Sequence, residues 1–322
     1  MRSINQASPA KKTLLALACA TIIAAPLAAA GPAWKPSPDS VSLAALGLSP
    51  AELAWVEARR SSTGTIKAAI RERPDTYEPQ PDGSARGFDW LLLREFAGTL
   101  GLDIDLTIEQ TIDSFFTRNG TVPRDISATG SNYSYTPDLL KKVDLYVSQF
   151  GLIPWRQKLM TMIPLVPTRD QLAGRLGEEI RSFSDLDGKR FAVIKDSIQE
   201  HSLADMAKAR GIRLDFVYGE DETALYRLVV GKEADYLLDA SVIFAKNARF
   251  LKGMSLSPYP EDVVMTAWCV KKDDRALASI LTKFVAAAQR SGLFGRLWTE
   301  DYGMDFSTYV NAVLASPETP LK

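Results

Sequence analysis

The sequence predicts an α/β protein with two lobes, each a mostly parallel sheet flanked by helices. The chain has 322 residues, enough for about two domains. Strand-like and helix-like segments alternate from 65 to 148, and a second alternating set runs from 191 to 239. The apolar segment at 263–270 then indicates that the chain returns to the first lobe.

The composition excludes several classes of function. With 46% hydrophobic and 24% charged residues the chain is of the globular type. Its 38 basic residues face 39 acidic ones, so no basic surplus is available for a phosphate backbone, and we expect no nucleic-acid partner. The single histidine, His201, excludes a metal site built from several histidines, and we expect no metal or cofactor.

The amino terminus has the pattern of an export signal. A positively charged start precedes an apolar run at 13–25, which is short for a hydrocarbon core of ~30 Å. The small residues Ala28, Ala29 and Ala30 would allow cleavage after Ala30. The sequence therefore predicts a signal peptide at 1–30, with an uncleaved anchor as the alternative.

The first lobe begins with strand-helix-strand signals. After a Pro- and Ser-rich tether, Ser49 and Pro50 mark the start of a short helix that ends at about Arg60. A strand is expected at 65–70. The four hydrophobic residues Phe88, Leu92, Phe96 and Leu100 then recur at a spacing of four, which predicts a helix ending at Gly101, and alternation over 102–108 predicts a strand.

The second set predicts strands at 191–194, 213–218 and 235–239, with helices at 199–209 and 223–230. Helices around 277–284 and 294–302 close the pattern. Parallel sheets place their ligands beyond the carboxyl ends of the strands, so we expect the functional residues there.

Several short motifs occur in an order that resembles the periplasmic solute-binding proteins of family 3, the polar amino-acid-binding type. They are Ile66-Lys67-Ala68, Gly87-Phe88-Asp89, Leu100-Gly101, Asp144 with Arg156 twelve residues later, Leu186-Asp187-Gly188-Lys189, Ser197-Ile198-Gln199-Glu200 and Gly231-Lys232-Glu233-Ala234-Asp235. The resemblance covers about 63–305. The helix that starts at Pro50 is similar to the segment that precedes such modules in sensor kinases and membrane-bound lytic transglycosylases.

This resemblance implies a two-lobed periplasmic-binding-protein (type II) fold with two crossover strands. The implied division is a signal peptide at 1–30, a tether and short helix at 31–62, a first lobe at 63–164 and 265–315, and a second lobe at 165–264. The implied protein is a periplasmic monomer that closes around a small carboxylate-bearing ligand, an amino acid or related polar metabolite. Uptake through an ABC permease, or sensing through a receptor, would follow, and the implied protein is not an enzyme.

The resemblance also assigns ligand contacts in the first lobe. Arg156 would grip the carboxylate by two parallel hydrogen bonds, and the alternative is an exposed arginine. Ser148 would meet the same carboxylate or would only cap the end of its strand. Tyr77 would cover the ligand or pack on the surface.

In the second lobe the resemblance assigns three residues. Ser197 and Gln199 open a helix whose free N–H groups favour an anion, and capping of that helix is the alternative. Asp239 would receive an amino group, although its spacing from Asp235 is one residue shorter than in the family.

Departures from the family pattern leave two other functions open. Met162-Ile163-Pro164-Leu165 lacks the aromatic residue of the family, and Asp196 and Ile198 replace a glycine and a hydroxyl residue. One alternative is a dehydratase or lyase on the same scaffold, with Glu200, Asp196 or Asp239 as general acid. The other is a regulatory module that has lost ligand binding.

Overall fold

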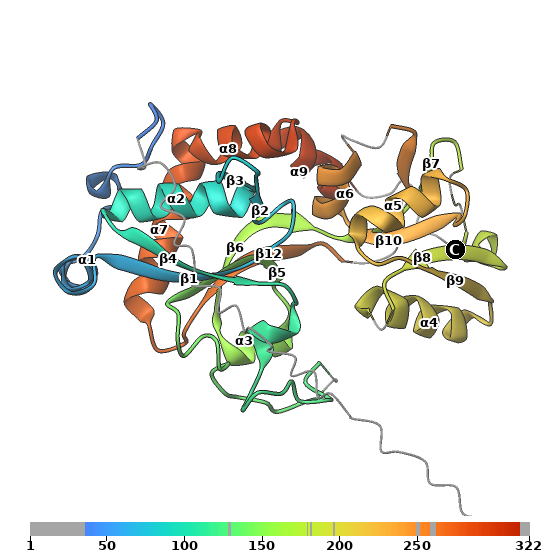
Figure 1. The fold of residues 1–322 in the computed structure, drawn as a ribbon, viewed down its shortest axis with the longest axis horizontal. Helices are drawn as coiled ribbons and strands as arrows, with labels where there is room; N and C mark the ends of the chain where they lie inside the picture. Colours follow the sequence, from blue (N-terminus) through green and yellow to red (C-terminus); the bar gives the residue numbers. More distant parts are fainter. Residues whose placement is uncertain are drawn as a thin grey trace, which may run out of the picture. The chain divides into compact units, whose positions relative to one another are not determined.

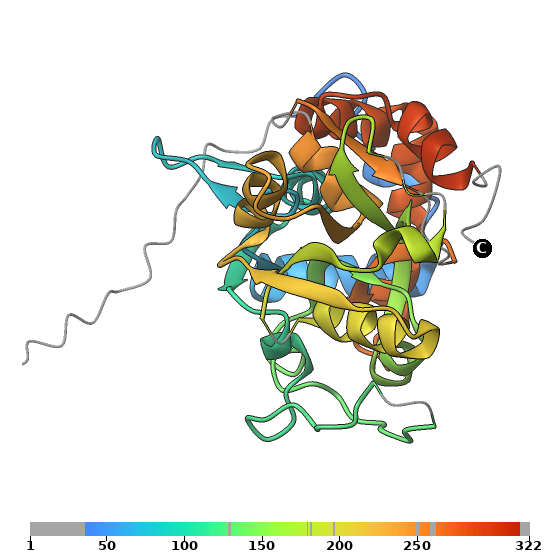
Figure 2. The ribbon, with the colours of Figure 1, turned by 90° about the vertical axis from the view of Figure 1, so that its right-hand side faces the viewer.

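The computed structural model describes residues 36–127, 130–178, 180, 182–195, 197–248, 252–257 and 262–315. The signal peptide predicted at 1–30 lies outside these residues. The described chain contains two five-stranded mixed sheets, one in each lobe, and a two-stranded ribbon of β2 (Glu78–Pro79) and β3 (Ala85–Arg86) (Figures 1 and 2).

The sheet of the first lobe has the strand order β4-β1-β5-β12-β6. Its strands are β1 (Thr65–Arg71), β4 (Asp103–Glu109), β5 (Leu145–Gly151), β6 (Thr161–Thr168) and β12 (Val264–Val270). β1 runs parallel to β4 and β5, whereas β12 is antiparallel to β5 and β6. The carboxyl ends of β1 and β5 therefore meet at one edge of this sheet.

The sheet of the second lobe has the order β11-β7-β10-β8-β9. Its strands are β7 (Asp170–Arg175), β8 (Lys189–Val193), β9 (Leu214–Tyr218), β10 (Tyr236–Ala240) and β11 (Met254–Ser257). β8, β9 and β10 are parallel. The chain passes between the sheets twice, from β6 to β7 through Arg169 and again between β11 and β12.

The α-helices of the described chain are α1 (Pro50–Ser62), α2 (Phe88–Leu100), α3 (Pro154–Leu159), α4 (Ile198–Arg210), α5 (Glu222–Val230), α6 (Ser241–Ala248), α7 (Arg275–Ser291), α8 (Leu293–Tyr302) and α9 (Phe306–Leu314). Short 3-10 helices occupy Leu43–Leu46, Asp113–Phe116 and Phe183–Leu186. The helices expected after Gly87, at 199–209 and at 223–230 correspond to α2, α4 and α5.

The first sheet separates two hydrophobic clusters. On one face Ile66, Ile70 and Trp268 pack with α2, α7 and α8. On the other face Tyr146 and Phe150 pack with three aromatic residues from outside the sheet. Phe115 and Phe116 come from the 3-10 helix before β5, and Trp155 comes from α3 after it. Cys269 is buried in this second cluster, as its apolar neighbours in sequence predict.

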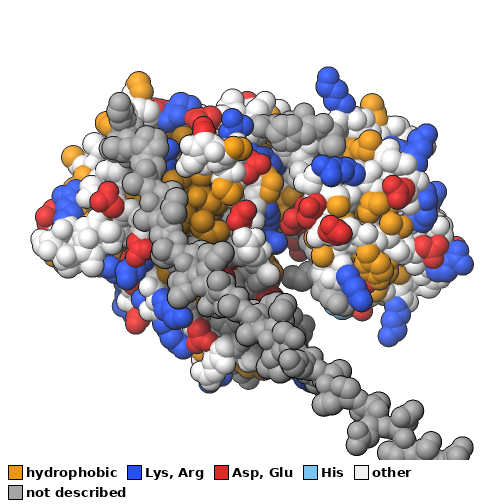
Figure 3. Space-filling model, viewed as in Figure 1, with side chains coloured by type: hydrophobic (Ala, Val, Ile, Leu, Met, Phe, Trp, Pro, Cys, Tyr) orange, Lys and Arg blue, Asp and Glu red, His pale blue; other side chains and the backbone are white. Residues whose placement is uncertain are grey.

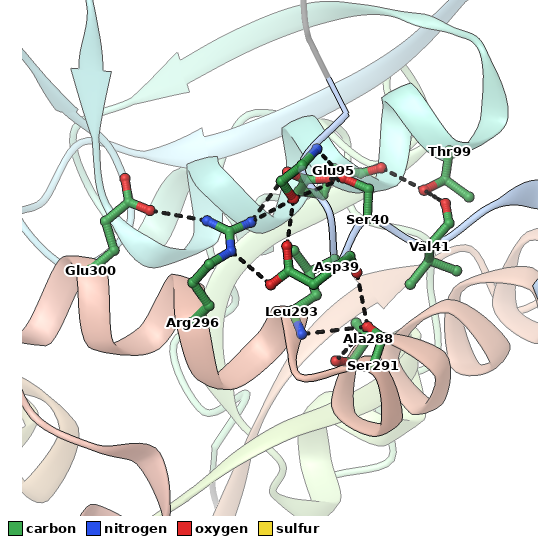
Figure 4. Close-up of polar contacts among 11 residues, drawn as sticks. Asp39, Ser40, Val41, Glu95, Thr99, Ala288, Ser291, Leu293, Arg296 and Glu300 are labelled. Atoms are coloured by element: carbon green, nitrogen blue, oxygen red, sulfur yellow. Dashed lines mark hydrogen bonds and ion pairs between the residues drawn. The ribbon is translucent and has the colours of Figure 1, made fainter.

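Residues 37–41, which belong to the predicted tether, are attached to the first lobe (Figure 4). Arg296 of α8 donates hydrogen bonds to Asp39 (2.7 Å) and to the hydroxyl of Ser37 (2.9 Å). Ser40 donates to Glu95 of α2 at 2.8 Å. The chain from Ser37 onward is therefore part of the folded lobe, and α1 continues this contact because Glu52 pairs with Lys283 of α7 at 2.6 Å.

Helix α6 follows the second sheet but packs on the first lobe. Its residues Val242 and Ala245 lie in the same hydrophobic cluster as α2, α7 and α8. The Lys246 Nζ donates to the Asp301 carboxylate at 2.5 Å, and both side chains are almost fully buried. Removal of one partner of such a buried ion pair strongly destabilises a protein, because the other charge is left buried and unpaired. The contact therefore holds α6 on α8.

Gly87, the residue before α2, has a backbone conformation that residues other than glycine rarely adopt. Its φ is +113°, and a Cβ at this position would lie 2.3 Å from the Thr76 carbonyl oxygen. We expect Gly87→Ala to lower the free energy of unfolding by about 3 kcal/mol or more, measured by urea unfolding. Gly83→Ala is the matched control, because its φ is +82° and no atom lies within 4 Å of the added Cβ. The control should lose about 1 kcal/mol, and equal losses in both variants would contradict the steric explanation.

Candidate functional site

Two arginines stand at the carboxyl end of β1. Arg71 is the last residue of the strand, and its backbone N–H donates to the Ser148 hydroxyl of β5 at 2.7 Å. Arg73 lies in the following turn and donates two hydrogen bonds to the Asp75 carboxylate, at 2.5 and 2.6 Å. Asp75 thus balances the charge of Arg73 within the first lobe.

Acidic groups of the second lobe face this end of β1. Glu222, the first residue of α5, has a carboxylate oxygen 3.6 Å from the Arg71 Nη2. This ion pair joins the two lobes where the carboxyl ends of their parallel strands meet. The space-filling view shows acidic and basic side chains gathered at the notch between the lobes (Figure 3).

Asp239, close to the end of β10, is a second acid of this region. Its side chain is buried, accepts a hydrogen bond from the Tyr226 hydroxyl of α5, and also accepts one from the Ala240 N–H at 2.8 Å. Burial raises the pKa of Asp239 to about 8, and the charges of Glu222 and Asp170 add to this effect. A carboxyl group of this kind is protonated at neutral pH and can donate a hydrogen bond or a proton.

Polar groups of β5 and β12 complete the first-lobe side. Gln149 has a φ of +32° and donates to the Tyr302 hydroxyl at 3.3 Å. The side-chain Oε1 of Gln149 and the hydroxyl of Thr266 are buried, and within the described chain neither has a hydrogen-bond partner. Buried polar atoms without a partner are rare, and a bound ligand or water would supply what they lack.

Arg156 lies close to this region but inside the aromatic cluster of the first lobe. Its guanidinium sits 5.1 Å from the ring centres of both Phe116 and Trp155, and 5.7 Å from that of Phe150. It donates to the Gly151 carbonyl at 3.1 Å, and burial lowers its pKa to about 10. The residue is therefore buried, in contrast to the exposed alternative, and its role as the carboxylate grip remains a prediction.

The other predicted site residues make local contacts. The Tyr77 ring packs edge-on against Trp90 at 5.4 Å. The Ser197 hydroxyl accepts the Glu200 N–H at 3.1 Å and so caps α4, where Gln199 is half-buried. Their part in ligand binding stays a prediction, as do those of Ser148 and Asp239.

Sequence reasoning missed Arg71, Arg73 and Glu222. A signal for two of them was present, because Arg71 directly follows the strand predicted at 65–70 and Glu222 directly precedes the helix predicted at 223–230. The rule that ligands bind beyond the carboxyl ends of parallel strands would have selected both positions.

Two pockets of the described chain lie away from these strand ends. One, of about 220 Å³, is formed by the amino-terminal segment with α2 and α8, and is lined by Ser37, Leu91, Arg94, Glu95, Arg296, Leu297 and Glu300. The other, of about 190 Å³, is a mainly apolar space between α6, β11 and α9. Within the described ranges no group of three or more His, Cys, Asp or Glu side chains could hold a metal ion, and no helix has the length and apolarity to span a membrane.

No protein-family model matches the chain. Among curated proteins it is similar to membrane-bound lytic murein transglycosylase F. The protein from Stutzerimonas stutzeri is 26% identical over 260 residues, which cover 79% of this chain and 49% of the relative. The one from Ectopseudomonas mendocina is also 26% identical, over 77% of this chain and 48% of its own length. The chain thus spans about half the length of the curated relatives that it matches.

Solved structures with the same fold are amino-acid-binding proteins. An ancestral cationic amino acid solute-binding protein superposes with a TM-score of 0.61 at 17% identity, covering 77% of this chain and 99% of that one. The cysteine-binding protein from Campylobacter jejuni gives a TM-score of 0.56 at 14% identity, over 77% and 92% of the two chains. The predicted two-lobed periplasmic-binding-protein fold is therefore confirmed.

The prediction that the chain is not an enzyme is contradicted by the curated relatives. Each of them is named as an enzyme, a lytic murein transglycosylase, and their similarity extends over about 79% of this chain. One solved neighbour, with a TM-score of 0.58 and 16% identity, is described as an ancestral amino-acid-binding protein and a precursor of cyclohexadienyl dehydratase. The resemblance to binding proteins misled this prediction because one scaffold can carry both kinds of function.

The raised pKa of Asp239 makes stability depend on pH. The folded chain keeps this proton up to about pH 8, whereas an unfolded aspartic acid loses it near pH 4. Unfolding between these values releases a proton, so Asp239 makes the folded state less stable as pH rises, by roughly 1 kcal/mol per pH unit. We expect urea unfolding of Asp239→Asn to show a flatter profile than the wild type from pH 5 to 8.

Asp235→Asn is the control for this experiment. Hydrogen bonds from Arg190 lower the pKa of Asp235 to about 2, so its charge is constant from pH 5 to 8. The slope of its profile should match that of the wild type. Parallel slopes for Asp239→Asn and the wild type would show that Asp239 is ionised in the folded chain.

Proposed function

We propose that the chain is an exported binding unit that takes a small, polar, carboxylate-bearing ligand between its two lobes and serves an enzyme system acting on murein. The observation that carries this proposal is the opposition of charge at the strand ends, where Arg71 faces Glu222 at 3.6 Å and the buried Asp239 lies in the same lobe as Glu222. A ligand with both a carboxylate and a hydrogen-bond acceptor or amine matches these two sides.

The energetics of such a site are sufficient for specific binding. One arginine–carboxylate pair with two charge-assisted hydrogen bonds contributes roughly 1.5–3 kcal/mol per bond. Micromolar affinity needs about −8 kcal/mol, which a few neutral hydrogen bonds and apolar contacts would complete. Contacts made only when both lobes touch the ligand would favour the closed state, and a partner could read that change.

The names of the relatives suggest where the ligand comes from. Murein contains short peptides with free carboxylates and amines, so its fragments have the chemistry that the facing arginine and acids would select. A periplasmic location after removal of residues 1–30 would place the chain beside murein. The partner is then a murein-cleaving enzyme, or the ABC permease or sensor receptor that the resemblance implies.

A thermal-shift titration of the full chain tests this proposal. The ligands are L-arginine, L-glutamine, L-cysteine and the murein tripeptide L-alanyl-γ-D-glutamyl-diaminopimelate. A ligand at a hundred times its Kd should stabilise the chain by about 2.7 kcal/mol. The absence of any shift with all four compounds at 10 mM would contradict the proposal.

A second candidate function is favoured by the burial of the Asp239 carboxyl group, which raises its pKa. A general acid needs a pKa close to the working pH, and the pKa of about 8 at Asp239 meets this condition. We expect a dehydratase or lyase of this kind to convert a cyclic carboxylic acid, detected by mass spectrometry. Asp239→Asn should then lose turnover by roughly 100-fold or more while ligand binding persists. Equal turnover in the variant and the wild type would exclude Asp239 as the acid.

A further inference from the structure

The ion pair between the lobes identifies the atoms that would receive a ligand. We infer that Arg71 binds the carboxylate of the ligand, and that Glu222 is an internal carboxylate which holds this place in the ligand-free protein. This inference rests on the proposed function and names the residues that carry it.

The position of Arg71 is fixed by the sheet. Its backbone N–H donates to the Ser148 hydroxyl, which fixes the end of β1. Its guanidinium reaches from this position toward Glu222 of the second lobe. The side chain is 22% exposed, and its Nε is buried without a hydrogen-bond partner in the described chain. Arg71 therefore has both an unused donor and an open side.

Of the two arginines at the end of β1, Arg71 is the one that is available to a ligand. Arg73 is bound to Asp75 through two donors, and its side chain is 12% exposed. Among the residues that the structure describes, Arg71 has no such bidentate partner, and its Nη2 lies 3.6 Å from Glu222, beyond hydrogen-bond range. Glu222 thus balances the charge of Arg71 without accepting a hydrogen bond from its Nη2 or Nε. A ligand carboxylate that accepts from both of these nitrogens would replace Glu222.

Glu222 is suited to this role by its place in the fold. It is the first residue of α5, whose amino-terminal dipole stabilises a carboxylate there, and its side chain is 28% exposed. Because it belongs to the second lobe, its contact with Arg71 also bridges the lobes. Binding of a ligand would exchange this internal bridge for one that runs through the ligand.

Arg156, the residue that the family resemblance assigns to the carboxylate, is less available. It is 6% exposed and has three aromatic rings within 6 Å of its guanidinium. Its Nη1 already donates to the Gly151 carbonyl, although its Nε, like that of Arg71, is buried without a hydrogen-bond partner in the described chain. A carboxylate could reach it only by displacing that packing, whereas Arg71 needs only a movement of Glu222.

Isothermal titration of the full chain tests the inference, with L-arginine as the probe and agmatine as its analogue without the carboxylate. Arg71→Gln should weaken L-arginine binding at least tenfold, since a charge-assisted pair is lost. Glu222→Gln should strengthen it about fivefold, because the internal competitor is removed. Agmatine should bind weakly and respond to neither change, and Glu220→Gln is the matched control for the loss of a nearby exposed acid.

A double-mutant cycle on urea unfolding without ligand provides an independent readout. Arg71→Gln and Glu222→Gln should be non-additive, and the coupling should shrink in 0.5 M salt. Unchanged L-arginine affinity in Arg71→Gln, or additive effects in the cycle, would overturn the inference. If the two residues are coupled but neither the wild type nor any variant binds L-arginine, the Arg71–Glu222 pair is real and the role of Arg71 in binding the ligand carboxylate is contradicted.

Discussion

The structure depends on one topological constraint, the meeting of the carboxyl ends of two sets of parallel strands. β1 and β5 end on the first-lobe side, and α5 and β10 supply the second-lobe side. The chain passes between the two sheets at Arg169 and again between β11 and β12. Because side chains from both sheets converge there, a basic residue of one lobe and an acidic residue of the other can form the 3.6 Å pair.

The rest of the molecule supports this arrangement from a distance. The buried pair of Lys246 and Asp301 fastens α6 to the first lobe, while the Asp301 carboxylate also accepts the Phe88 N–H at the start of α2. The amino-terminal segment binds α2 and α8 through Asp39 and Arg296. The first lobe is therefore tied together on the side of α2, α7 and α8, and its opposite face is packed by the aromatic cluster that surrounds Arg156.

The sequence allowed most of the fold to be predicted, because the periodicities of α2, β4 and α5 are strong. It did not predict β6, since Pro164 and Pro167 argue against a strand, and the structure accommodates both prolines because β6 lies at the edge of its sheet. The candidate site was harder to predict. The order of the motifs predicted Arg156 as a site residue, but the aromatic rings around it are evident only in the folded structure. The pair of Arg71 and Glu222 was not predicted because the two residues lie far apart in the sequence.

The central claim is that a ligand carboxylate reaches the Arg71 guanidinium. The most direct measurement is the ¹⁵N–¹H NMR spectrum of the arginine Nε groups, assigned through variants, before and after addition of L-arginine with natural isotope abundance. The account predicts that the Arg71 Nε resonance shifts on binding while that of Arg156 stays in place. A shift confined to Arg156, with Arg71 unchanged at saturation, would contradict it.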